Sequence, residues 1–293
     1  MTTQNLRLGI ILMIATSFVF AMQDGISRHL AGTYNTYMVV MVRYWFFAAF
    51  VIALAARAPG GLAKAVKTRQ PGVQIFRGLL LAAEICVMVQ AFTILGLVES
   101  HAVFAAYPLL VALLSGPVLG EKVGWRRWTA IGIGFAGVLI ILRPGYAVFD
   151  PAALIPFLAA TMFALYGLLT RYVARQDAAS VSFFWTGVSG MVAMTLVGVW
   201  FWEPMTGPDW AWMGLLCLTA ASGHFLLIKS LEVAEASAVQ PFAYLQLVFA
   251  TGLGILVFGE TLELPVAIGA AVVVAAGIFT LWRARMREAA REV

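Results

Sequence analysis

Ten apolar stretches follow one another along the chain, and each is about as long as a helix that crosses a bilayer. Such a helix needs roughly 20 mostly apolar residues to span about 30 Å of hydrocarbon. Polar residues, glycines and prolines fill the breaks between the stretches. The pattern predicts an all-α integral membrane protein with ten transmembrane helices, at approximately 6–29, 35–57, 74–96, 100–119, 126–143, 152–173, 181–202, 210–230, 236–258 and 264–282. The third and fourth runs, and the eighth and ninth, are joined by very short turns, so we expect each pair to form a tight helical hairpin.

The composition agrees with this pattern. Of the 293 residues, 62% are hydrophobic and only 11% are charged, whereas a soluble domain carries roughly 25% charged residues. The net charge of +5 does not indicate nucleic-acid binding, because the basic residues lie between apolar runs rather than in a patch with exposed aromatic residues. Cys86 and Cys217 both lie inside apolar runs, so we expect no disulfide framework, no metal site and no cofactor. The lipid bilayer is the expected surrounding.

Lysine and arginine residues gather in alternate connections. If the N-terminus is cytoplasmic, sixteen of the 19 basic residues, Arg77 among them, lie in cytoplasmic connections. Arg28 and Arg143 lie outside, and Arg43 lies within a span. Because basic residues stay on the cytoplasmic side, this bias predicts that both termini are cytoplasmic.

An internal repeat appears when the sequence is shifted by 136 residues. Chance matching of apolar residues would explain aligned leucines but not an aligned acidic residue or a Gly-Glu pair at span ends. The matches of this kind are Glu99 with Glu235, and LGEK at 119–122 with FGET at 258–261. The sequence therefore predicts two five-helix repeats, residues 1–146 and 147–293. Since five is odd, the second repeat enters the membrane from the opposite side, as in many secondary transporters.

Two segments carry a resemblance to a known family. They are VLGEKVGWRRWTAIGIGFAGVLIIL at 118–142 and VFGETLELPVAIGAAVVVAAGIFTL at 257–281, with YPLL at 107–110 before the first. With ten spans in two halves, the chain resembles the EamA type of the drug/metabolite transporter superfamily. Within it, the chain is similar to bacterial inner-membrane exporters of aromatic and other neutral amino acids. The resemblance implies a central cavity lined by the first, third and fourth helices of each half, and export as the direction of transport.

Ionisable residues inside the membrane are candidates for function because a charge there is costly. Asp24 and Arg43 lie at similar depth in the first two predicted helices, so we expect a structural ion pair between them. Glu84 has no Lys or Arg one helical turn away, and could hold a proton or bind an amino group of the substrate. Only Arg43 and the peripheral Lys229 place a cation near the predicted cavity.

Uncharged polar and aromatic residues on the predicted cavity helices suit a zwitterion with an apolar side chain. Each of them alone is more often a packing residue, and a lone helix histidine is more often neutral than a ligand. With Glu84, the candidate substrate-binding set comprises Gln90, Phe104, Tyr107, Tyr166, Trp185, His224, Tyr244 and Gln246.

Pro108 and Pro241 lie near corresponding points of the two repeats. Since proline removes a backbone hydrogen bond, both are predicted hinges at which the hairpins rock. The alternative for Pro241 is a proline that simply starts a helix.

These features predict a secondary transporter that exports neutral or aromatic amino acids, or similar small metabolites, by alternating access. A hydrophobic-cation exporter, for example of methyl viologen, with Glu84 as the anion, stays open. An exchanger of sugar phosphates or nucleotide sugars is disfavoured because such cargo needs Lys or Arg in the cavity. No nucleophile-base pair or metal motif indicates an enzyme. The oligomeric state stays open.

Overall fold

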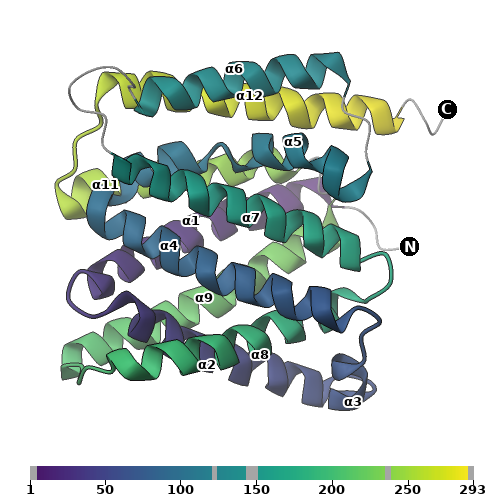
Figure 1. The fold of residues 1–293 in the computed structure, drawn as a ribbon, viewed down its shortest axis with the longest axis vertical. Coiled ribbons are helices and arrows are strands. Elements are labelled where there is room, and N and C mark those ends of the chain that lie inside the picture. Colours follow the sequence, from purple (N-terminus) through teal and green to yellow (C-terminus); the bar gives the residue numbers. More distant parts are fainter. Residues whose placement is uncertain (1–4, 121–123, 143–150, 235–238, 290–293) are drawn as a thin grey trace.

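The computed structural model describes residues 5–120, 124–142, 151–234 and 239–289. Within these ranges every regular element is a helix, and the long helices run back and forth in one bundle (Figure 1). The elements are α1 (Leu6–Ala31), α2 (Thr36–Arg57), α3 (Gly61–Val66), α4 (Pro71–Phe104), α5 (Tyr107–Leu119), α6 (Trp125–Leu142), η1 (Pro151–Ala153), α7 (Leu154–Val173), α8 (Ala179–Gly198), η2 (Val199–Phe201), α9 (Gly207–Val233), η3 (Gln240–Tyr244), α11 (Leu245–Phe258) and α12 (Leu264–Ala289).

Seven helical stretches in the described ranges are long and apolar enough to cross a membrane. The shorter apolar helices are Tyr107–Leu119, Trp128–Ile141 and Leu264–Thr280. The prediction of an all-helical membrane protein is confirmed, whereas the count of ten spans stays a prediction. The predicted repeat boundary after residue 146 lies within 143–150, outside the described residues.

The two predicted hairpins contain the main breaks in helical geometry. Gly96 interrupts α4 with φ 85° and ψ 176°, a backbone conformation that favours glycine. This break lies where the sequence places the turn between the runs 74–96 and 100–119. A second interruption, the turn at residues 105–106, separates α4 from α5. In the other hairpin, the predicted turn reaches residues 235–238, outside the described ranges, and the run after it starts with the 3₁₀ turn η3 before α11 continues.

Helices far apart in the sequence form the main packing pairs. The most extensive pairs are α1 with α9, α4 with α7, α2 with α8 and α6 with α12, while α5 packs on α7 and α11 packs on α1. In Figure 1, α6 and α12 form an outer layer at one edge of the bundle, and α2 and α8 lie at the opposite edge. The middle of the bundle is thus formed by α1, α4, α5, α7, α9 and α11.

Glycines on α8 allow the close approach of α2 and α8. A Cβ atom at Gly190 would lie within 3 Å of the Tyr44 ring, and one at Gly198 would meet the Tyr37 carbonyl oxygen at 2.8 Å. Small residues serve membrane helices in this way because tight packing, rather than exclusion of water, holds such helices together.

The bundle has two ends, which differ in the chain segments that they hold. In Figure 1 the helix α1 begins, and α12 finishes, at the same end, which we call the terminal end. The opposite end, where α1 finishes, is the Gly96 end, because Arg28 in the last turn of α1 pairs with Glu260, whose carboxylate binds the backbone beside Gly96.

Candidate functional site

A cavity lies where the two interrupted helices meet. We call it the paired-break pocket, because one wall comes from the junction of α4 and α5 and the other from the junction of η3 and α11. Its lining residues are His101, Phe104, Ala105, Tyr107, Pro108, Ala243, Tyr244, Gln246 and Leu247. The space between these residues, its open mouth included, is about 430 Å³. Broken helices of this kind form substrate sites in many secondary transporters.

Five residues singled out from the sequence meet in this pocket: Phe104, Tyr107, Pro108, Tyr244 and Gln246. The sequence interpretation did not select His101. One feature could have indicated it. His101 lies one helical turn before Ala105, so both residues lie on the same face of α4, next to the break at residues 105–106.

Both prolines begin helices. Pro108 lies in the first turn of α5, and Pro241 lies in the first turn of η3. A proline costs nothing there, because the N–H groups of a first turn have no helical partner. The helix is already broken at residues 105–106, just before Pro108. A hinge at these breaks stays a prediction.

Four aromatic rings extend from the pocket along α7, and we call them the aromatic wall. Phe104 and Tyr107 each lie against Phe163, with ring centroids 5.5 and 5.1 Å apart. Phe163 in turn lies 6.1 Å from Tyr166, so the wall continues away from the pocket. Three of these rings were predicted site residues, and Phe163 was missed although it lies one turn before Tyr166 on the same helix.

Arg77 ends the aromatic wall. Its guanidinium carbon lies 5.2 Å from the centre of the Tyr166 ring, and its nitrogens donate to the Tyr166 and Thr170 hydroxyls, the Gln74 amide oxygen and the Ser182 carbonyl. Arg77 is only 1% exposed. The sequence interpretation counted it among the connections, which is wrong because α4 begins at Pro71 and carries Arg77 more than a full turn into the bundle. A fixed cation therefore stands close to the predicted cavity helices.

Asp177, in the connection from α7 to α8, holds the terminal end together. It accepts hydrogen bonds from the Thr68 hydroxyl, from the Arg69 backbone N–H at 3.0 Å and from the Gln74 amide at 2.9 Å. Desolvation opposes ionisation of Asp177, but these hydrogen bonds and the charge of Arg69 outweigh it and hold its pKa below the usual value. The ionised carboxylate thus joins two connections that lie about 100 residues apart in the sequence.

Asp24 contacts His101 and Gln246 instead of its predicted partner Arg43. Its Oδ2 atom lies 3.0 Å from His101 Nε2 and accepts a hydrogen bond from the Gln246 amide at 2.9 Å. The predicted ion pair assumed that the consecutive helices α1 and α2 pack against each other. They touch only slightly, because α1 packs mainly on α9 and α11.

Arg43 and His224 lie together in a second cavity. Phe20 and Phe47 surround the His224 ring, with centroids at 5.3 and 5.7 Å. Glu84 is buried within electrostatic reach of Arg43 and of Asp24. The lining residues of this cavity are Arg43, Tyr44, Phe47, Leu81, Ile85, Ala220 and His224.

Four of the candidate substrate-binding residues line neither cavity, namely Glu84, Tyr166, Gln90 and Trp185. Gln90 is exposed, accepts a hydrogen bond from Thr36 and donates one to Thr93. Trp185 donates from its indole nitrogen to the Val66 carbonyl, 3.2 Å away at the terminal end. The structure therefore brings only part of the predicted set into one place.

The Gly96 end is closed by a contact among three chain segments, which we call the latch. The Glu260 carboxylate accepts hydrogen bonds from the backbone N–H groups of Leu97 at 2.9 Å and Val98 at 2.8 Å, just after the break at Gly96. It also forms an ion pair with Arg28, whose guanidinium lies 4.1 Å from the centre of the Phe258 ring. A carboxylate is favoured there because the first N–H groups of a helix lack partners.

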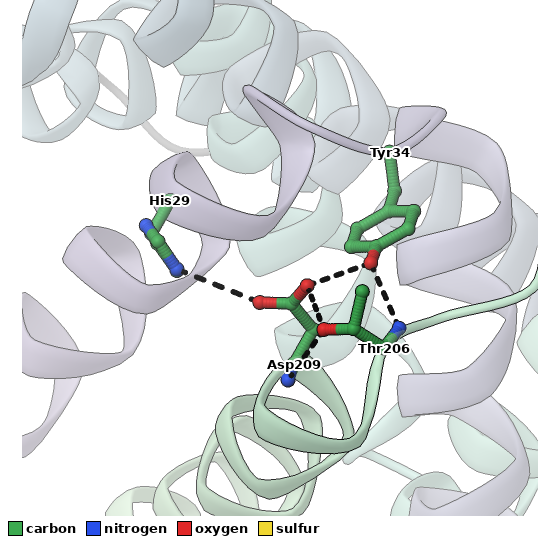
Figure 2. A network of polar contacts seen from close by, with 4 residues as sticks. All are labelled: His29, Tyr34, Thr206 and Asp209. Carbon is green, nitrogen blue, oxygen red and sulfur yellow. Dashed lines mark hydrogen bonds and ion pairs between the residues drawn. The ribbon is translucent and has the colours of Figure 1, made fainter.

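A second polar contact at the same end is drawn in Figure 2. Tyr34 donates to Asp209 at 2.6 Å and accepts from the Thr206 backbone at 3.1 Å, while Thr206 caps α9. His29 Nε2 lies 3.9 Å from the other Asp209 oxygen, and its side chain is 47% exposed. This network fixes the start of α9 to the turn between α1 and α2.

Comparison with known proteins identifies the kind of protein that has this geometry. The sequence model of the EamA-like transporter family matches residues 7–143 and 151–282. The chain is 27% identical to an S-adenosylmethionine uptake transporter of Rickettsia prowazekii, over 94% of this chain and 92% of that protein. It is 26% identical to a riboflavin transporter of Vibrio cholerae, over 97% of each chain.

Two further comparisons extend this picture. The chain is 24% identical to a pseudopaline exporter of Pseudomonas aeruginosa, over 94% of this chain and 96% of that protein. A solved crystal structure has the same fold, with a TM-score of 0.64 at 17% identity, covering 94% of this chain and 98% of the other.

Proposed function

The chain belongs to the EamA-like transporter family, and we propose that this multi-pass membrane transporter exports a small zwitterionic solute with an aromatic or other planar group across the inner membrane. The solute binds in the paired-break pocket and reaches each side of the membrane in turn. Neutral aromatic amino acids are the first class to test.

The pocket at the two breaks is the observation that carries the proposal. Tyr107 and Tyr244 face it from the two sides, and Gln246 and His101 supply polar groups. The aromatic wall offers rings against which a planar group can stack, and such a pair is worth about 0.5–1.5 kcal/mol beyond the area that it buries.

The packing pairs support two inverted five-helix repeats, and the distribution of basic residues supports cytoplasmic termini. In such a repeat α1 corresponds to α7, α4 to α9 and α5 to α11. The contact of α1 with α9 is then the counterpart of α7 with α4, and α11 on α1 is the counterpart of α5 on α7. The remaining pairs, α2 with α8 and α6 with α12, each join a helix to its own counterpart. Two matched stretches of the family model also support this division.

The named relatives widen the range of solutes to test. S-adenosylmethionine and riboflavin each contain a planar heteroaromatic ring system, which suits an aromatic wall. A sugar phosphate or nucleotide sugar gains support from Arg77, which the sequence interpretation had left out of the cavity helices. However, four acceptors already occupy Arg77, so a phosphate would have to compete with them. The zwitterion therefore remains the better candidate.

The test is counterflow in proteoliposomes that contain the purified protein. Vesicles loaded with unlabelled solute receive a trace of the same labelled solute, with tryptophan, phenylalanine, S-adenosylmethionine, riboflavin, methyl viologen and a nucleotide sugar assayed in turn. We expect exchange of tryptophan or S-adenosylmethionine, and loss of this exchange in Tyr107→Ala. Gln90→Ala, outside both cavities, is the matched control and keeps the exchange. Exchange of methyl viologen or the nucleotide sugar alone would refute the proposed substrate class.

A further inference from the structure

The contact between Asp24 and His101 contains one proton more than a carboxylate and a neutral histidine would hold. His101 Nδ1 lies 3.0 Å from the Leu97 carbonyl oxygen, which can only accept, so Nδ1 carries a hydrogen. The other ring nitrogen, Nε2, lies 3.0 Å from Asp24 Oδ2. Two lone pairs would repel each other at this distance, so a second hydrogen lies between these atoms, on Nε2 or on the carboxyl group.

Gln246 fixes this arrangement. Its amide nitrogen donates to the same Oδ2 atom at 2.9 Å, so that oxygen already has one donor from α11. His101 is also stacked face to face on Phe92, with ring centroids 5.1 Å apart and an angle of 5° between the planes. The imidazole therefore cannot turn away from Asp24 without losing its contacts with the Phe92 ring and the Leu97 carbonyl oxygen.

The pair borders the paired-break pocket, with His101 buried and the Asp24 side chain 14% exposed. His101 is 4% exposed, and both His101 and Gln246 line the pocket. Asp24 lies seven residues before the end of α1, about 10 Å inward from the Gly96 end. A proton held there lies at the solute site rather than at the membrane surface.

Charged and titratable groups surround the pair on several helices. The nearest cation on α1 is Arg28, one turn away, but the latch pairs it with Glu260. Among the described residues, further titratable groups in this region are Arg43 on α2, Glu84 on α4, Tyr107 on α5, Tyr244 on η3 and, beside Arg43, His224 on α9.

We propose that Asp24 and His101 form the proton-binding site through which solute transport is coupled to a proton gradient. When the Gly96 end opens, a proton reaches Asp24 and His101 from that side, and it is held between them once α1 and α4 close together at that end, as seen here. Solute that enters the pocket from the terminal end displaces the proton to that side, so the proton moves inward as the solute moves outward. The step moves one proton: the N–H or O–H bond that holds it forms on binding and breaks on release, and no other bond changes. This inference rests on the proposed transport function and names its coupling ion.

The proton site itself can be tested without a transported solute. The chain contains three histidines, so ¹⁵N-labelled histidine gives three sets of ring signals in nanodiscs, assigned by substitution. We expect the His101 ring to carry hydrogen on Nδ1 throughout, and the pair to lose one proton in a single step as the pH rises. Asp24→Asn should abolish that step and leave the His29 titration unchanged. A His101 signal that does not respond to Asp24→Asn overturns the proton site.

Coupling is tested with labelled tryptophan in the same proteoliposomes. With one proton exchanged per solute, a gradient of one pH unit sustains about tenfold accumulation. We expect Asp24→Asn to keep counterflow, which needs no net proton movement, and to lose the accumulation driven by the gradient. His101→Gln should lose this accumulation as well. His29→Gln and Asp209→Asn, the same residue types at the exposed Gly96 end, are the matched controls and keep both activities.

The outcomes separate the two proposals. Loss of gradient-driven accumulation only in Glu84→Gln, with Asp24→Asn still coupled, assigns the proton to Glu84 and overturns the inference. Full coupling in both Asp24→Asn and His101→Gln overturns it as well. If no solute of the panel exchanges in counterflow, the proposed function fails, while the histidine titration still decides whether the proton site exists.

Discussion

Replacing Glu260 by glutamine should open the Gly96 end of the transporter. The carboxylate binds the Leu97 and Val98 N–H groups and the Arg28 guanidinium. An amide of the same shape has a single acceptor oxygen and turns its NH₂ group toward one of these donors. It therefore leaves a backbone N–H unpaired and Arg28 without its counter-ion.

The size of the effect follows from these contacts. A hydrogen bond to a charged group contributes about 1.5–3 kcal/mol, and a buried donor left unpaired costs about 1–3 kcal/mol. The Arg28 and Glu260 side chains are 20% and 13% exposed, so water offsets part of this loss. A net change of about 2 kcal/mol would shift the balance between closed and open states roughly 30-fold.

Labelling of a single cysteine measures this shift. Ala105 lines the paired-break pocket, and the natural Cys86 and Cys217 are free and buried, so both are replaced by alanine before Ala105→Cys is introduced. A membrane-impermeant maleimide is then added on the side of the Gly96 end. We expect the labelling rate to rise by about tenfold or more with Glu260→Gln, in line with a shift of about 2 kcal/mol. Glu203→Gln, an exposed residue at the same end, is the control. An unchanged rate, or an equal rise in the control, would refute the latch.

Three further predictions address other parts of the structure. Gly96→Ala should weaken the latch and lower the thermal stability, because φ is +85° and the new Cβ would lie 2.6 Å from a Glu260 carboxylate oxygen; thermal unfolding in detergent and the same labelling assay measure both. Because the pKa of Asp177 is lowered, its ionised carboxylate stabilises the folded protein at pH values above the ordinary carboxyl pKa of about 4. This stabilisation is lost as the pH falls through the lowered pKa of the folded state. The free energy of unfolding of Asp177→Asn should therefore lack this part of the dependence on acid pH. Phe163→Leu should weaken solute binding by up to about tenfold with little change in stability, since it removes one ring of the wall worth about 0.5–1.5 kcal/mol; binding to the purified protein measures this, and an unchanged affinity contradicts a stacking role.

The positions of the helices could be predicted from the sequence because the solvent imposes their pattern. A span must be apolar over a fixed length, and Gly96 was found as a break because it ends one such run. The breaks before α5 and α11 were only indicated, since Pro108 and Pro241 are compatible with a kink and with a helix start.

The partners of buried polar residues could not be predicted in the same way. Asp24 was assigned to Arg43 on the next helix of the chain, whereas its contacts come from His101 and Gln246, which lie 77 and 222 positions away. Arg77 was counted with the basic residues of a connection, whereas its four acceptors come mostly from α7 and α8. Such contacts depend on which helices pack together, and apolar periodicity does not encode that choice.

The central claim is that the solute occupies the paired-break pocket rather than the cavity around His224. Protection of single cysteines from alkylation tests it most directly, with Ala105→Cys in the first cavity and Ala220→Cys in the second, each without the natural cysteines. The account predicts that the solute exchanged in counterflow slows alkylation at position 105 and leaves position 220 unaffected. Protection at position 220 without protection at position 105 would contradict it.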